Sequence, residues 1–143
     1  MTVRAIITFK GRDCVTVAPD ATLAEAARLL AKHRIGALVI TGAERRVVGI
    51  LSERDIVHAM AAKGELALAL PVSGAMTRDV VTCGEDETIP ELMQRMTAGR
   101  FRHVPVVDRG QLSGIVSIGD VVKHRLAELE REHDALREYI ATA

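Results

Sequence analysis

The sequence contains two copies of a short polar motif in which an aspartate follows a serine by three residues. Residues 49–57 read "GILSERDIV" and residues 114–122 read "GIVSIGDVV", so the pairs are Ser52 with Asp55 and Ser117 with Asp120. A serine and an acid at this spacing, ahead of an apolar run, form a good helix N-cap. Free N–H groups at a helix N-terminus also attract a phosphate, and a carboxylate offers two acceptors to the paired hydroxyls of a ribose. The motif therefore leaves helix capping and ligand binding both open.

The two copies differ at the start of the predicted strand that comes before the strand leading into each motif. The second copy reads "GRFRHVPVVD", which places three basic side chains there: Arg100, Arg102 and His103. The first copy reads "HRIGALVIT", with Gly36 and Ala37 at the positions of the last two. We therefore expect the Asp120 site to be the better phosphate site, and the Asp55 site to be empty, weaker or suited to a less charged ligand. A solvated basic strand edge is the simpler alternative.

An internal repeat supplies the elements that position these side chains. The segment "VTVAPDATLAE" (15–25) aligns with "VTCGEDETIPE" (81–91), and the likeness continues to both Ser-x-x-Asp motifs. Each copy predicts a strand, a helix capped by a Thr-x-x-Glu box, a hairpin and a final helix that starts at Ser-x-x-Asp. The predicted strands are 15–17, 37–41 and 46–51 in the first copy, and 80–83, 103–107 and 111–116 in the second. The predicted buried helix faces are Leu23, Ala26, Ala27 and Leu30 in the first copy, and Ile89, Leu92, Met93 and Met96 in the second.

The repeat predicts an α+β fold made of two β-α-β-β-α units. One unit alone would bury too little surface to fold robustly, so we expect the two to pack sheet against sheet about a pseudo-twofold axis. The predicted limits are 1–66 for the first repeat with an N-terminal linker, 67–125 for the second repeat, and 126–143 for a C-terminal helical extension. Equivalent clefts are expected where strand ends and helix N-termini of the two repeats meet.

Composition narrows the classes of function. Lys plus Arg and Asp plus Glu both number 19, so no overall field draws the protein to nucleic acid or to a membrane surface. Cys14 and Cys83 form no C-x-x-C pair and are predicted to be small core residues on strands. With no secretory leader and no run long enough to span a membrane, we expect a cytoplasmic protein. The sequence shows no catalytic constellation and no metal-ligand spacing.

A tandem β-α-β-β-α chain with G-h-x-S-x-x-D in each copy resembles the CBS (cystathionine β-synthase) domain pair, or Bateman module, over residues 10–125. The resemblance implies a stand-alone module whose clefts bind adenine nucleotides: AMP first, with ADP, ATP or NAD(H) as further candidates. It assigns one cleft to Asp120, Ser117, Arg102, His103, Val15 and Lys10, and a weaker one to Asp55, Ser52, Val81 and Met76. Base recognition would use the backbone of 10–15 in the first of these and of 76–81 in the second. Lys10 and Gly11 are expected to form a small loop that reaches a phosphate.

The leading hypothesis is a sensor without catalytic activity or catalytic cofactor, whose bound state alters an unknown partner protein. The alternative is an oligomeric scaffold with degenerate, empty clefts in which Ser-x-x-Asp only caps helices. Nucleic-acid binding by "GRFRH" is disfavoured by the zero net charge.

The last segment predicts a contact with a second chain. Apolar side chains recur at alternating spacings of four and three, as in a coiled-coil seam. The seam residues are Val122, Leu126, Leu129, His133, Leu136 and Ile140. We expect a homodimer through the helices of the two repeats and this C-terminal helix, with His133 packed or partly solvated rather than bound to a metal.

Overall fold

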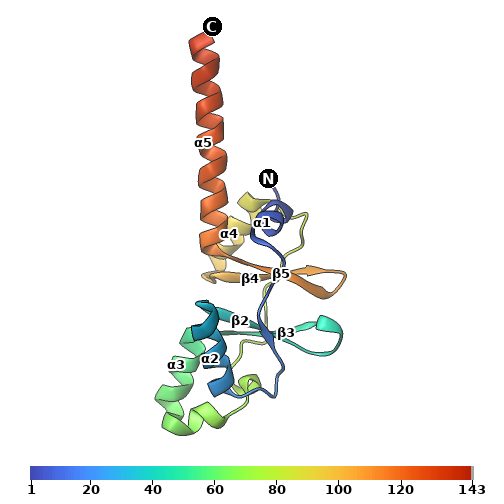
Figure 1. The fold of residues 1–143 in the computed structure, drawn as a ribbon, viewed down its shortest axis with the longest axis vertical. Helices are drawn as coiled ribbons and strands as arrows, with labels where there is room; N and C mark the ends of the chain where they lie inside the picture. Colours follow the sequence, from blue (N-terminus) through green and yellow to red (C-terminus); the bar gives the residue numbers. More distant parts are fainter. Residues whose placement is uncertain (143) are drawn as a thin grey trace.

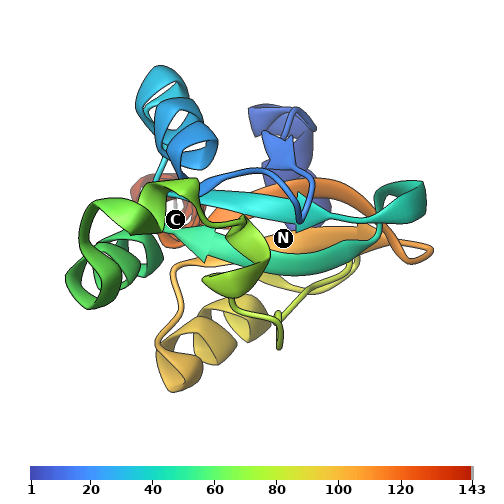
Figure 2. The same cartoon turned by 90° about the horizontal axis from the view of Figure 1, so that it is seen from below.

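The computed structural model describes residues 1–142 and places two small sheets face to face between helices (Figure 1). The first sheet has the order β1-β2-β3, with β1 at Thr16–Val17, β2 at Ala37–Thr41 and β3 at Val47–Ser52. The second consists of β4 at His103–Asp108 and β5 at Gln111–Ser117. The view from below in Figure 2 shows the strands of the two sheets overlapping and running in roughly the same direction, with helices outside them. The predicted α+β class and both hairpins are confirmed.

The first repeat buries its helices against the outer face of its sheet. α2 runs over Leu23–His33 and α3 over Glu53–Lys63, followed by the short helices η2 (Gly64–Ala69) and η3 (Val72–Gly74). Another short helix, η1 (Ala43–Arg45), lies in the β2–β3 connection. The predicted inner face of α2 is confirmed, because Leu23, Ala26 and Leu30 are buried and Ala27 packs against them. Thr22 caps α2 by accepting the Glu25 N–H at 3.2 Å.

The second repeat has the same plan. α4 runs over Ile89–Gly99 and buries Ile89, Leu92 and Met96, with Met93 packed against them as expected. α5 runs without a break over Ile118–Thr142, so the last helix of the repeat and the predicted extension are one element. Figure 1 shows α5 rising far beyond the two sheets.

The strand predicted at 80–83 is wrong except at its last residue. Cys83 forms a single parallel bridge with Val106, in which its N–H donates to Pro105 O at 3.0 Å and its carbonyl accepts the Val107 N–H at 2.9 Å. An extension of this ladder toward Val81 needs an N–H from residue 105. Since proline has none, the pairing stops.

A helix that the sequence analysis missed precedes the first repeat. α1 runs over Val3–Lys10 and buries Val3, Ile6 and Ile7 in the core of the second repeat, not the first. It is tied there by bonds such as Val3 N to Glu87 O at 2.9 Å. Lys10 is the last residue of this helix, so the expected Lys10–Gly11 loop is wrong at Lys10.

The segment between the repeats also packs on the repeat that it does not precede. We call this segment and α1 the exchanged segments. Ala67 and Val72 lie in the core of the first repeat, and Val72 N donates to Ala21 O at 2.7 Å. The stretch ahead of each repeat therefore packs on the other repeat, as a pseudo-twofold relation requires. The domain limits drawn from the sequence remain a prediction, but each core includes a segment from outside its own repeat.

Candidate ligand site

Asp120 lies in the first turn of α5 and is held by the predicted cap. Its Oδ2 accepts the Ser117 backbone N–H at 2.9 Å, and its own N–H donates to Ser117 Oγ at 3.1 Å. These reciprocal bonds make a capping box. The carboxylate is thus fixed at a helix N-terminus, where the dipole favours negative charge.

Lys10 adds a cation to this carboxylate from the end of α1. Its Nζ lies 2.7 Å from Asp120 Oδ2 and also donates to Ile115 O at 3.0 Å. Burial tends to raise the pKa of Asp120, but hydrogen bonds from Lys10 and Ser117 hold that pKa below its usual value. Within residues 1–142, these bonds all involve Oδ2, which leaves Oδ1 without a protein partner.

His103 and Arg102 join the same region from the start of β4. His103 pairs with Ser117 across the β4–β5 ladder, and the Arg102 carbonyl accepts the Ile118 N–H at 2.8 Å. Burial lowers the pKa of His103, as do the charges of Lys10 and Arg102, while Asp120 and Glu53 oppose them. Four of the predicted residues, with Lys10 as the fifth, are therefore grouped around the N-terminus of α5: Asp120, Ser117, Arg102 and His103.

Gly36 explains how His103 fits between the repeats. A Cβ at Gly36 would lie 3.5 Å from His103 Cε1, so the imidazole ring lies against the start of the opposite hairpin. The Gly36 carbonyl accepts the Glu53 N–H at 3.0 Å, which mirrors the Arg102–Ile118 bond. The equivalent strand starts of the two repeats therefore meet at the pseudo-twofold axis.

The Asp55 site has the same cap without the cations. Asp55 Oδ2 accepts the Ser52 N–H at 2.8 Å, and the Asp55 N–H donates to Ser52 Oγ at 3.3 Å. Ile7 and Met76 occupy equivalent places over the sheets, and three residues later the chain has Lys10 in one case and Asp79 in the other. The two sites therefore differ in the charged residues around the same cap.

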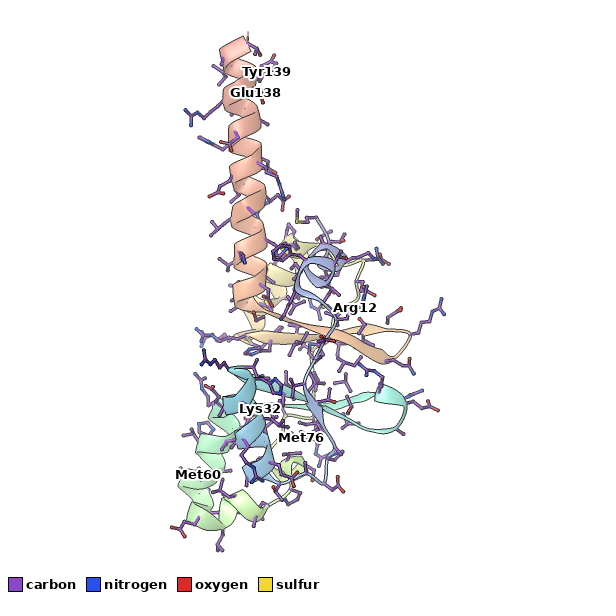
Figure 3. The ribbon with its side chains drawn as sticks, in the orientation of Figure 1. Arg12, Lys32, Met60, Met76, Glu138 and Tyr139 are labelled. Carbon is purple, nitrogen blue, oxygen red and sulfur yellow. The ribbon has the colours of Figure 1, made fainter. Side chains whose placement is uncertain are left out.

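The remaining predicted residues, Val15, Val81 and Met76, lie in or near the packed cores of the repeats. Val15 packs against the first core, and Val81 is half-buried. Met76, labelled in Figure 3, also packs on the first core. Its side chain lies against Gly49 of β3. The structure shows no contact from these three to either aspartate among the residues it describes, so their part in a site remains a prediction.

The glycine that opens each motif has a role that the sequence analysis did not assign. A Cβ at Gly114 would come within 2.7 Å of Ile7 Cδ1, and one at Gly49 would collide with the Met76 side chain. Each glycine therefore lets the exchanged segment cross the sheet closely. The i, i+3, i+4 spacing of Val3, Ile6 and Ile7 was the signal for α1, but the helix is short and its partner surface is distant in sequence.

The two cysteines lie apart from the Asp120 and Asp55 sites in sequence and form no disulfide within residues 1–142. Cys83 is buried, as predicted, and desolvation raises the pKa of its thiol to about 12. Cys14 is half-buried but lies outside the strands, so that part of the prediction is wrong. Residues 1–142 contain no group of three or more His, Cys, Asp or Glu that could hold a metal ion. The same residues include no helix with the length and apolar character to cross a bilayer.

Known proteins resemble this chain over most of its length. The family model for the CBS domain matches it twice, at residues 3–62 and 72–127. An uncharacterised 17.7 kDa protein of Acidianus ambivalens is 40% identical over 108 residues, which are 75% of this chain and 64% of that protein. Two CBS domain-containing proteins of Arabidopsis thaliana are 36% identical over 82% of this chain, but the match spans only 21% of their length.

Three solved structures have the same fold. The CBS-domain protein ATU1752 of Agrobacterium tumefaciens is 52% identical, with a TM-score of 0.83 over 87% of this chain and 99% of its own. PAE2072 of Pyrobaculum aerophilum, solved with AMP, is 30% identical with a TM-score of 0.75 over 84% and 89% of the two chains. The CBS pair of MJ0100, solved with 5′-methylthioadenosine and S-adenosylmethionine, is 29% identical with a TM-score of 0.79 over 90% and 98%.

Proposed function

The chain belongs to the CBS domain family as a tandem pair, and from that premise we propose that its Asp120 site binds an adenine nucleotide, AMP first among them. Such binding would make the protein a regulatory module that signals to a partner protein rather than an enzyme. The observation that supports this most is the ion pair of Lys10 with the Asp120 carboxylate at a helix N-terminus, beside the start of β4 where Arg102 and His103 lie.

The geometry suits the two polar parts of a nucleotide separately. Asp120 Oδ1 would accept the ribose hydroxyls, because the protein bonds to this carboxylate all use Oδ2. The N-terminus of α5, Arg102 and His103 would contact the phosphate. The Lys10 ammonium donates two of its three hydrogens to Asp120 and Ile115, and its third would join these contacts to the phosphate. AMP in PAE2072 and the adenosyl ligands of MJ0100 support this class of ligand.

The Asp55 site would bind the same ligands more weakly, or prefer an uncharged adenosyl compound. It retains the carboxylate and the helix N-terminus, but Gly36 and Ala37 stand where the other site has Arg102 and His103. A phosphate would meet fewer cations there, so the nucleotide preference of the two sites should differ.

Calorimetric titration of AMP, ADP, ATP, NAD(H) and S-adenosylmethionine tests the proposal, with Asp120→Ala as the key variant. Asp55→Ala is the matched control, because it removes the equivalent helix cap and leaves the Asp120 site intact. Loss of a charge-assisted contact predicts affinity about ten- to a hundredfold lower in Asp120→Ala. Binding of no adenosyl compound below millimolar would end the sensing hypothesis. An Asp120→Ala variant that binds as tightly as the wild type would show that the site assignment is wrong.

One observation favours the second candidate, an oligomeric scaffold. Lys10 and Ser117 already satisfy Asp120 Oδ2, so this carboxylate is stable in the fold without any ligand. If the protein is a scaffold, none of the five compounds should bind, and Asp120→Ala should have the same fold and the same oligomeric state as the wild type.

A further inference from the structure

Within residues 1–142, α5 has an apolar face that the other elements leave uncovered. Leu126, Leu136 and Ile140 are each more than half exposed, and Val122 and Leu129 are about two-fifths exposed. Figure 3 shows the end of α5, where Glu138 and Tyr139 are labelled, standing clear of the rest of the molecule. A helix of 25 residues with such a stripe is stabilised in water mainly by burying it.

We propose that this stripe pairs with the same stripe of a second copy, as a parallel, in-register two-stranded coiled coil. The spacing assigns Leu126, His133 and Ile140 to a positions and Val122, Leu129 and Leu136 to d positions. The shallow groove between α4 and α5 lies beside the base of the stripe and adds apolar contact surface from Pro90, Met93 and Ala98.

The charges that flank the stripe select the parallel orientation. In a parallel pair a g residue faces the e residue five positions later on the other chain. Arg125 then faces Glu130 of the second copy, and Glu132 faces Arg137, so each contact joins opposite charges and occurs twice. None of the three side chains Glu130, Glu132 and Arg137 is engaged in an ion pair within residues 1–142 of its own chain.

The antiparallel alternative brings like charges together. With the two seams fully overlapped, e residues face e residues and g residues face g residues. Glu130 would meet Glu130, Glu132 would meet Glu132, and Lys123 would meet Arg137. Like charges at these positions oppose association. His133 at a central a position would face its own counterpart in the parallel pair, and a single polar a residue fixes the register at some cost in stability.

Sedimentation of the full-length chain over a range of concentrations tests the interface. The wild type should reach a dimer, and Leu129→Asp should weaken that dimer about a hundredfold by placing two carboxylates in the seam. Leu66→Asp is the matched control, because Leu66 is an exposed leucine on η2, away from the stripe. Helical content by circular dichroism shows whether each variant has folded. A monomeric wild type, or a Leu129→Asp dimer as tight as the control, would overturn the proposal.

Two further measurements test the orientation. Glu132→Lys should weaken the dimer about three- to tenfold, and adding Arg137→Glu should restore it, because the parallel pair regains opposite charges. Ile140→Cys should form an interchain disulfide readily, since parallel helices bring the two cysteines together. In the overlapped antiparallel pair they would lie about 27 Å apart at 1.5 Å per residue. Failure of both the charge rescue and the disulfide would refute the parallel arrangement even where a dimer forms.

Discussion

Replacing Lys10 with methionine is the most direct test of how the Asp120 site works. Methionine keeps the apolar stem at the end of α1 but removes the ammonium that lies 2.7 Å from Asp120 Oδ2. If Lys10 contacts the phosphate of a nucleotide, its loss removes one charge-assisted contact, worth about 1.5 to 3 kcal/mol in a dry site. The Lys10 side chain is 33% exposed, so solvent screens part of this energy. We therefore expect the lower end of the range, roughly a tenfold loss of AMP affinity.

Adenosine is the control ligand for AMP, because it has the base and the ribose but no phosphate. Lys10→Met should leave adenosine affinity unchanged or slightly higher, because Asp120 no longer has an ammonium competing for its oxygens. Titration of AMP and adenosine into both proteins gives the four affinities. Lys123→Met is the control: it removes a nearby cation of α5 that lies over the Phe9 ring, 5.3 Å from its centroid. Equal losses for AMP and adenosine would refute phosphate contact and leave Lys10 with the role of ordering Asp120.

Three more predictions concern the fold around the site. Gly114→Ala should lower the free energy of unfolding by about 1–3 kcal/mol in urea denaturation, because its Cβ would overlap the buried Ile7 Cδ1; an unchanged free energy would mean that the Ile7 side chain moves aside at no cost. The pKa of His103 is lowered in the fold, so protonation of the unfolded state should reduce stability as pH falls below about 6.5. His103→Gln should flatten this decline between pH 7 and 5.5, and an unchanged slope would exclude His103 as its source. Alkylation of the native protein should modify the half-buried Cys14 well before the buried Cys83, whose pKa is about 12. Mass spectrometry of the peptides gives the order of modification, and earlier modification of Cys83 would contradict the prediction.

The parts of the fold that the sequence predicted are those encoded by local patterns. The hairpins, the caps at Thr22 and Thr88, and the inner faces of α2 and α4 follow from periodicity and turn residues within about twenty positions of one another. Repetition strengthened each assignment, since a pattern found in one copy could be checked in the other.

The parts that failed depend on partners distant in sequence. α1 is short, and the surface that buries Val3, Ile6 and Ile7 is made by residues after position 82. The missing strand at 80–83 depends on one absent N–H, that of Pro105, in a strand more than twenty residues away. Neither effect can be predicted from the pattern of residues within a short stretch of sequence.

In the Asp120 site too, the features set by local sequence could be predicted, and the feature that depends on a distant segment could not. The aspartates and the cations of β4 could be found from the repeat, but the contact of Lys10 with Asp120 follows only from the crossing of α1 onto the second repeat. The equivalent crossing onto the first repeat ends at Asp79 instead of a lysine. The two exchanged segments therefore cross their sheets at equivalent glycines but differ in backbone, since one is the helix α1 and the other pairs with β3 at Thr77, and they carry opposite charges at equivalent positions. On this reasoning, the difference in affinity of the two sites for a phosphate should depend on the exchanged segments as much as on the motifs. Asp79→Lys should then raise AMP affinity at the Asp55 site, measured in an Asp120→Ala background, and no gain there would show that the exchanged segment does not reach that site.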